Sequence, residues 1–275
     1  MTPASGRLNF IEGGAIVQQK KEDTGQPGGR QPRVGEIGPS MSLIRAAVMR
    51  HMADLGLSPG ARLLDAPCGA GELAAALAQE GFEIWGADLD TTAQNGLGER
   101  FQAVDLNKPL PWPDASFDAV CSVEGIEHLE DWFAFLREVH RVLRPGGTLV
   151  LTTPNIVSLR SRVRFLGSGF FHKDPRPLDE SRRHPLHHIG LGTFPEFRYA
   201  LHTSGFRLSV ASHTHVKPVS YLYAIFVPWM WLYTLLAFRK EKSPAQRERN
   251  REMRRVLFSP SLLFGENLLL TARKV

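Results

Sequence analysis

Apolar and polar residues alternate in blocks along residues 42–90, and each block has the length of one helix or strand. Apolar residues recur at helical spacing over residues 42–56. A short apolar run follows at residues 61–66, then a helix pattern at 71–81 that closes on a glycine, and a second apolar run at 82–90. A strand, a helix and a second strand within such a short stretch predict a β-α-β unit.

The same alternation continues to residue 154. Residues 101–106 and 117–123 have strand patterns, and residues 131–147 read as a helix that starts at a capping Asp131 and stops at Pro-Gly-Gly. The β-branched run at 148–154 is the next strand. Repeated alternation of this kind predicts an α/β fold with a mostly parallel sheet and helices on both faces.

The pattern becomes irregular between residues 155 and 190. This stretch is too long for an ordinary connection, so we expect a lid or a substrate-binding segment. Regular patterns return with a helix at 193–206, a strand at 207–216 and a last strand at 267–274.

The two last strands are separated by an apolar run and a basic run. Residues 219–238 carry no formal charge, and residues 239–255 hold eight Arg or Lys against three Glu, which accounts for the net charge of +5. Twenty apolar residues nearly suffice to cross a hydrocarbon core of about 30 Å. Because both ends of the insertion must return to the same sheet, a single crossing is rejected, and Pro228 is expected to split the run into two arms.

Three readings of the insertion remain open. The aromatic residues of the apolar run and the basic residues after it suit a peripheral contact with an anionic membrane surface. The same residues could instead cover the active site as a lid, or form a dimer contact. Nucleic acid is not expected, because no nucleic-acid motif accompanies the charge.

Composition limits the cellular setting. Two cysteines, Cys68 and Cys121, are too few for a disulfide framework, and the first residues lack the pattern of a secretory signal. We therefore expect a cytoplasmic protein, peripheral at the inner face of the membrane. Residues 1–40, rich in Gly, Pro, Gln and charge, are expected to form a flexible arm.

Residues 63–77 carry the most informative local motif. A strand ends at Asp65, and a turn with Gly69 and Gly71 leads into a helix, so a ligand can approach the backbone closely. Asp88 ends the next strand, where its carboxylate could accept both hydroxyls of a ribose. The third glycine of the dinucleotide fingerprint is replaced by Ala74, which disfavours a dehydrogenase.

These residues resemble the class I S-adenosylmethionine-dependent methyltransferases, with local similarity to the ubiquinone-biosynthesis O-methyltransferases. The resemblance implies a Rossmann-like seven-stranded sheet, mostly parallel, with the apolar and basic insertion before the last strand. It implies S-adenosylmethionine as cofactor, held by the first motif with Pro67 in place of its first glycine, by the acidic residue after the second strand, and by a third motif near the adenine. The cofactor residues implied are Asp65, Pro67, Gly69, Gly71, Asp88, Leu89, Asp105 and Leu106.

The stretch after the fourth strand reads E-G-I-E-H and offers catalytic groups. It resembles the E-x-x-E-H segment of the ubiquinone-biosynthesis enzymes, where Glu124, Glu127 and His128 could hold a divalent cation, although none is expected here. His128 could instead transfer a proton or only pack near the cofactor. His187 and His188, in the irregular stretch, are further candidates at a substrate entrance, with no carboxylate or cysteine completing a zinc site around them.

The combined interpretation divides the chain into three parts. Residues 1–40 form the flexible arm, residues 41–216 and 264–275 form the methyltransferase domain, and residues 217–263 form the insertion. No Asn-Pro-Pro-Tyr-type motif and no Pro-Cys nucleophile follows the fourth strand, which leaves a small or lipid-like acceptor. We expect O-methylation of a lipidic or lipid-linked small molecule, with a soluble metabolite enzyme and a non-catalytic cofactor-binding scaffold as alternatives.

Overall fold

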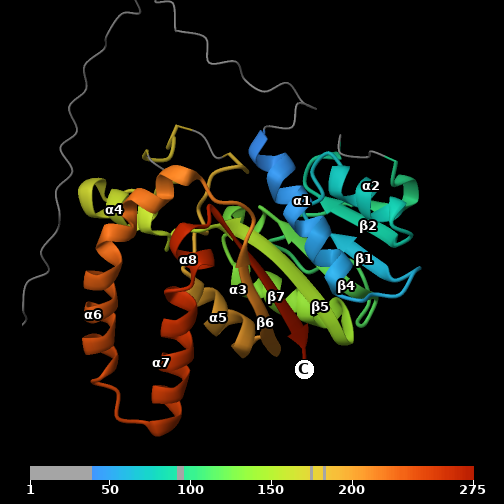
Figure 1. Cartoon of the computed structure of the whole chain (residues 1–275). Coiled ribbons are helices and arrows are strands. Elements are labelled where there is room, and N and C mark those ends of the chain that lie inside the picture. Colours follow the sequence, from blue (N-terminus) through green and yellow to red (C-terminus); the bar gives the residue numbers. More distant parts are fainter. Residues whose placement is uncertain (1–38, 92–95, 174–175, 182–183) are drawn as a thin grey trace, which may run out of the picture. The chain divides into compact units, whose positions relative to one another are not determined.

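A seven-stranded sheet forms the centre of the protein in a computed structural model (Figure 1). The structure describes residues 39–91, 96–173, 176–181 and 184–275, all within the compact unit Ile37–Val275. The strand order is β3-β2-β1-β4-β5-β7-β6, and β7 is antiparallel to both of its neighbours. The strands are β1 (Arg62–Asp65), β2 (Glu83–Asp88), β3 (Phe101–Ala103), β4 (Phe117–Val123), β5 (Leu143–Pro154), β6 (Phe206–His213) and β7 (Asn267–Lys274). The predicted Rossmann-like, mostly parallel sheet is confirmed.

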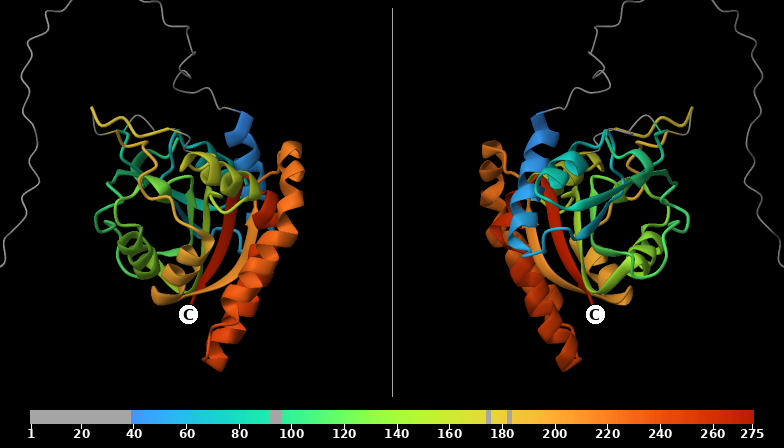
Figure 2. Two further views of the ribbon diagram at one scale, coloured as in Figure 1. Left: turned by 90° about the vertical axis from the view of Figure 1, so that its left-hand side faces the viewer. Right: turned by 90° about the vertical axis from the view of Figure 1, so that its right-hand side faces the viewer.

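Helices cover both faces of this sheet. On one face lie α1 (Pro39–Asp54) and α2 (Glu72–Gln79), whose Val48, Met52 and Leu77 pack against β1, β4 and β5. On the other face lie α3 (Trp132–Val142) and α5 (Phe194–Thr203), which contribute Phe135 and Phe197 to a second apolar cluster. The two views of Figure 2 show the same layers from the sides. This burial of apolar area on both faces is the main stabilising term of the fold.

The helix that begins at Asp131 ends earlier than its sequence suggests. Asp131 caps α3 by accepting a hydrogen bond from the amide of Ala134 at 2.8 Å, as predicted. The helix stops at Val142, and Pro145-Gly146-Gly147 belong to β5 instead of closing the helix. A Cβ on Gly147 would lie 3.1 Å from the carbonyl oxygen of Asp118, so the glycine lets β5 pass close to β4.

The irregular stretch after β5 contains a helix that the pattern did not predict. Ser158 caps α4 (Leu159–Ser168), and Gly169 ends it with φ +71°. Short 3₁₀ helices elsewhere are η2 (Gly98–Arg100) and η3 (Ile126–His128), which follows β4. The helix α5 begins with the full capping box of Thr193 and Glu196.

The insertion between β6 and β7 is helical. It contains the 3₁₀ helix η4 (Pro218–Phe226) and the α-helices α6 (Val227–Phe238), α7 (Pro244–Leu257) and α8 (Pro260–Phe264), with α6 and α7 side by side in Figure 1. Pro228 lies in the first turn of α6, where a missing N–H costs nothing, so the run changes from 3₁₀ to α geometry without an interior proline kink. Val216 and Gly265 form a bridge where the insertion leaves and rejoins the sheet.

The stretch Pro218–Phe238 is long and apolar enough to cross a membrane, by length and composition, and it lies unburied on the surface. Both of its ends connect to strands of the same sheet, β6 and β7, which pair with each other. The predicted boundary of the flexible arm at residue 40 falls inside α1, because α1 begins at Pro39; residues 1–38 lie outside the described residues.

Candidate active site

The predicted cofactor residues gather at one edge of the sheet. The strands β1, β2, β4 and β5 are parallel, so their carboxyl ends meet there, and Pro154 at the end of β5 pairs with Asn267 at the start of β7. Ligands of open α/β sheets bind outside this edge. Asp65, Asp88 and Glu124 all lie at or just beyond it.

The turn after β1 has the backbone geometry that its glycines predict. Gly69 and Gly71 have φ +49° and +77°, a conformation that residues with a side chain seldom adopt. The amide of Gly69 donates a hydrogen bond of 2.8 Å to Oδ2 of Asp88, and the amide of Asp90 donates to Oδ1 at 2.9 Å. A carboxylate has about four acceptor positions, so Asp88 keeps capacity for two further donors, which fits a ribose.

Asp65 is buried at the base of this turn. Its carboxylate oxygens have no hydrogen-bond partner of good geometry within the part of the chain that the structure describes. Burial, and then the negative charge of Asp88, raise its pKa to about 8. A buried carboxyl group of this kind fits a cationic ligand, since a positive charge would compensate the ionised form. S-adenosylmethionine carries such charges.

The third motif follows β3, the strand that pairs with β2. Asp105 accepts hydrogen bonds from the amide and side chain of Asn107 at 3.1 and 3.2 Å, while Leu106 next to it is buried. Leu89, which follows Asp88, is 60% exposed and therefore available to cover a flat ring. The cofactor roles of these residues stay predictions.

Gly125 fixes the distance between the two loops of the site. A Cβ at this position would lie 2.1 Å from Cδ of Pro67, which is far inside contact distance. The turn after β1 and the turn after β4 therefore touch, and Pro67 fills the space where the family pattern has a glycine. No sequence motif signalled this requirement at Gly125.

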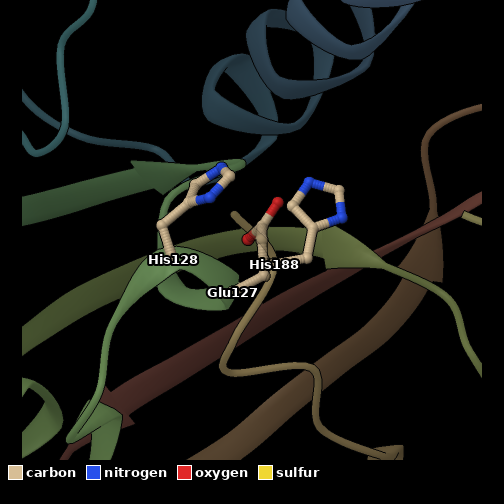
Figure 3. A group of neighbouring side chains, drawn as sticks. All are labelled: Glu127, His128 and His188. Carbon is tan, nitrogen blue, oxygen red and sulfur yellow. The ribbon is translucent and has the colours of Figure 1, made fainter. Parts of the chain in front are cut away.

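The last three residues of the E-x-x-E-H stretch form the 3₁₀ helix η3 (Ile126–His128), and Glu124 lies just before it. A loop that ends at Gly190 packs against this turn, because the amide of Gly190 donates to the carbonyl of Glu127 at 2.8 Å. The loop brings His188 to within 4.9 Å of His128, measured between ring centroids. In Figure 3 the carboxylate of Glu127 lies between the two imidazoles, and one ligand atom from each of the three residues lies within 4.8 Å of the others.

This cluster differs from the two cation sites considered from the sequence, one in the E-x-x-E-H stretch and one at the loop histidines. Glu124 does not join Glu127 and His128; His188 does. Sequence reasoning found no carboxylate to complete a site with the loop histidines, whereas Glu127 lies close to His188 across a separation in sequence that no local pattern reports. Glu127 is buried and accepts a hydrogen bond of 3.2 Å from Thr153. Burial, and then the charge of Glu124, raise the pKa of Glu127 well above its usual value.

Glu124 is not a member of this cluster and is held in place by hydrogen bonds. Its φ of 50° is rare for a residue with a side chain. Thr152 donates to Oε1 at 2.8 Å, and the side-chain amide of Asn267 donates to Oε2. Burial raises the pKa of Glu124, and both hydrogen bonds and the charge of Lys173 oppose the rise. Backbone strain held by such contacts is typical of functional sites.

His128 has the hydrogen bond that a proton acceptor needs. Its Nδ1 lies 3.2 Å from the carbonyl oxygen of His187. A carbonyl can only accept, so Nδ1 carries the hydrogen and Nε2 is the basic nitrogen. Burial lowers the pKa of His128, although the His187 carbonyl opposes this shift. The neutral, proton-accepting form therefore prevails near neutral pH.

His187 contributes its backbone to the site. Its imidazole packs at a tilt of 35° against His184, with ring centroids 5.5 Å apart, while its carbonyl orients His128. Sequence reasoning missed Asn267, Thr152 and Thr153, which hold the two glutamates from β5 and β7. Their only signal in the sequence is position at the carboxyl edge of the predicted sheet.

Comparisons with known proteins agree with this geometry. Residues 64–151 match the family model described as a methyltransferase domain. A protein of Mycolicibacterium smegmatis named a probable S-adenosylmethionine-dependent methyltransferase is 38% identical over 103 residues, which cover 36% of this chain and 40% of that protein. The ubiquinone biosynthesis O-methyltransferase of Xanthomonas campestris pv. campestris is 38% identical over 126 residues, covering 41% and 51%. The chain thus matches about half, or less, of the length of these relatives.

The solved structures extend the similarity of fold beyond the matched segment. A SAM-dependent methyltransferase from Archaeoglobus fulgidus superimposes with a TM-score of 0.53 at 18% identity, covering 85% of this chain and 94% of that one. At this identity the likeness concerns the fold alone. Residues 64–151 are thus similar to a methyltransferase domain, and the strand order and the glycine turn fit this similarity.

Proposed function

We propose that this protein transfers a methyl group from S-adenosylmethionine to an oxygen of a lipidic or lipid-linked small molecule, and that it works at the cytoplasmic face of a membrane. One observation carries the membrane part: an exposed apolar helix, η4 with α6, is attached directly to the edge of the sheet that carries the cofactor motifs. The family match supports the methyl transfer.

Methyl transfer requires the protein to align the donor with the acceptor and to remove a proton from the acceptor. Bound S-adenosylmethionine supplies an activated methyl group on a sulfonium. The chain aligns donor and acceptor, which can contribute up to about 7–11 kcal/mol. Asp88 has acceptor capacity for the ribose, and the buried Asp65 compensates positive charge on the ligand.

His128 is the proposed general base. Its Nε2 is the proton-accepting nitrogen because the His187 carbonyl fixes the tautomer. A base of this kind accelerates the reaction of a hydroxyl group by about 10²–10⁴-fold. His188 lies against His128 and is proposed to line the entrance for the acceptor. Glu124 is proposed to hold the turn through its bonds to Thr152 and Asn267.

The apolar surface of the insertion has the composition of a membrane-interface helix. Exposed apolar side chains recur at intervals of three or four residues, so they share one face. Tyrosine and tryptophan favour the interfacial region of a bilayer, and basic residues favour anionic headgroups. α7 runs beside α6 and carries most of the basic run. The members of the apolar face at this spacing are Leu222, Ile225, Trp229, Leu232 and Leu236, and the exposed Tyr233 lies next to Leu232.

A monotopic contact fits the connections of the insertion better than a crossing does. β6 and β7 are paired strands of one sheet, so the insertion must leave and return on the same side. The alternative of a soluble enzyme with a lid would require α6 to pack over the site, whereas all described residues of α6 lie at least partly exposed. The relative from Xanthomonas is named for O-methylation in ubiquinone biosynthesis, which supports a lipidic acceptor.

Transfer of labelled methyl groups tests this function. The intact protein, labelled S-adenosylmethionine and a whole-cell extract should give label in the organic-solvent fraction. Label confined to the aqueous fraction would support the soluble-metabolite alternative and contradict the proposal. Binding of S-adenosylmethionine with no transfer to any fraction would support a non-catalytic scaffold.

Co-sedimentation with anionic vesicles tests the membrane contact. We expect the protein to pellet with vesicles, and the triple variant Leu222→Ser, Ile225→Ser, Trp229→Ser to bind at least about a hundred-fold more weakly, because each buried apolar side chain contributes about 1.5–3 kcal/mol. Tyr199→Ser is the matched control, since Tyr199 is equally exposed on α5 outside the insertion. Equal binding of the triple variant and the control would refute the membrane contact.

A further inference from the structure

A group of cations surrounds one buried carboxylate at the point where the insertion leaves and rejoins the sheet. Glu266 Oε2 lies 3.1 Å from Nζ of Lys217 and 3.7 Å from Nζ of Lys173, and Oε1 lies 3.4 Å from Nη1 of Arg160. Nε2 of His172 lies 3.7 Å from Oε2. Only 3% of the Glu266 side chain is exposed, whereas 48% of Lys217 is exposed, so the cations face outward from the carboxylate.

The cations outnumber the carboxylate that they share. Arg160, Lys173 and Lys217 contribute three positive charges and Glu266 one negative charge, so two positive charges remain (3 − 1 = 2) even when His172 is neutral. Burial alone would raise the pKa of Glu266, but His172, Lys217 and Lys173 hold it well below its usual value, so the carboxylate stays ionised. Three half-buried or exposed cations for one carboxylate are more than an internal ion pair requires.

Two further acidic groups lie near this cluster. Glu124 and Glu127 both interact with the charge of Lys173, and burial raises the pKa of each. Nζ of Lys217 lies 3.1 Å from Oε2 of Glu266, a contact that engages one N–H donor of the ammonium group. A lysine ammonium has three N–H donors, so two remain for another acceptor.

The cation group lies between the proposed membrane face and the catalytic edge. Lys217 immediately precedes η4, the first helix of the apolar insertion. On the other side, Nζ of Lys173 donates to Oδ1 of Asn267 at 3.2 Å, and the amide of Asn267 donates to Glu124 in the turn before His128. An amphiphile that rests its apolar part on α6 would therefore bring a charged group to these cations and a neighbouring hydroxyl toward the site.

We propose that Arg160, Lys173 and Lys217 form a subsite for a phosphate ester group on the acceptor. A phosphate monoester carries a charge near −2 and three acceptor oxygens, which matches the two excess charges and the several donors. The subsite deepens the proposed function and rests on it: the acceptor is an anionic, phosphorylated amphiphile.

Calorimetric titration of the intact protein with octyl phosphate, below its micelle concentration, tests the subsite. We expect octyl phosphate to bind more tightly than octyl glucoside or inorganic phosphate. Lys217→Gln and Arg160→Gln should each weaken octyl phosphate binding about ten-fold, the usual loss for one hydrogen bond to a charged group. Arg207→Gln is the matched control, because Arg207 is exposed at the opposite end of β6.

A second variant separates a binding subsite from a purely structural ion cluster. Glu266→Gln removes the competing negative charge and should tighten octyl phosphate binding, whereas a structural cluster would only lose thermal stability. Unchanged affinity in Lys217→Gln and Arg160→Gln, or no binding of octyl phosphate by protein that still binds S-adenosylmethionine, would overturn the subsite. Binding of inorganic phosphate as tight as that of octyl phosphate would overturn its assignment to the acceptor.

Different experimental results would contradict the subsite and the methyltransferase activity. Octyl phosphate binding that depends on Lys217, together with an absence of methyl transfer, would leave the subsite standing and contradict the proposed function. Methyl transfer to a lipid without phosphate, together with an absence of octyl phosphate binding, would contradict the subsite and leave the proposed function standing.

Discussion

The buried carboxyl group of Asp65 makes a prediction about stability that does not depend on the acceptor. Asp65 is 1% exposed, and burial with the charge of Asp88 raises its pKa to about 8. In the unfolded chain the same group ionises near about pH 4. Between these values the folded state keeps a proton that the unfolded state has lost, so stability without ligand falls as the pH rises.

The size of this effect follows from the pKa difference. Each pH unit inside the window changes the free energy of unfolding by about 1.36 kcal/mol. From about pH 5 to about pH 8, Asp65 alone should lower the stability by about 4 kcal/mol, which corresponds to roughly 10 °C in melting temperature for a domain of this size. Asp65→Asn has nearly the same shape and no charge at any pH, so it should remove this loss.

Thermal unfolding of the protein without ligand, followed by circular dichroism across this pH range, measures the difference. Glu124 and Glu127 also have raised pKa values and act in the same direction, but they are present in both proteins. The comparison therefore isolates Asp65: the wild-type melting temperature should fall with pH more steeply than that of Asp65→Asn. Parallel profiles would refute the conclusion that Asp65 is protonated in the folded protein near neutral pH.

Further predictions concern the two loops of the site. Gly125→Ala should lower the melting temperature and weaken S-adenosylmethionine binding in calorimetry, because its Cβ would meet Cδ of Pro67 at 2.1 Å. Gly167→Ala, within α4 and with open space around it, should lower neither, and an unchanged Gly125→Ala would contradict the contact. His128→Ala should lower kcat about 10²-fold or more without changing cofactor affinity. His187→Ala should lower kcat much less, since His187 acts through its carbonyl, and equal losses of kcat in the two variants would argue against a proton transfer by His128. The lowered pKa of His128 keeps it neutral in more acidic solution, so the acid limb of the rate profile should lie below about pH 6.5, and a limb above this value would exclude His128 as the base. A chelator should leave activity unchanged, and loss of activity on adding the chelator would indicate a metal at the cluster of Figure 3.

Local patterns were sufficient to predict the sheet. The glycine turn after Asp65, the capping Asp131 and the last strand at 267–274 appear in the structure as expected, because each depends on residues that are near in sequence. The end of α3 was misplaced, since β5 already pairs with β4 at Leu143, and the Pro-Gly-Gly segment falls in the register irregularity before Thr148.

The parts of the site that were missed depend on contacts between distant residues. His188 meets Glu127 only because the loop ending at Gly190 packs on η3. Glu266 meets Arg160 from a position 106 residues away, and Asn267 reaches Glu124 over a longer separation still. Such pairs leave no periodic signal, so one sequence cannot reveal them.

Transfer of a labelled methyl group into the lipids of isolated membranes tests the central claim most directly. The intact protein, incubated with labelled S-adenosylmethionine and membranes, should place label in the organic-solvent fraction. Asp88→Ala should lose this transfer, because the carboxylate that holds the turn at Gly69 and has capacity for the ribose is removed. Cofactor binding by the wild-type protein with no label in the organic-solvent fraction would contradict the account.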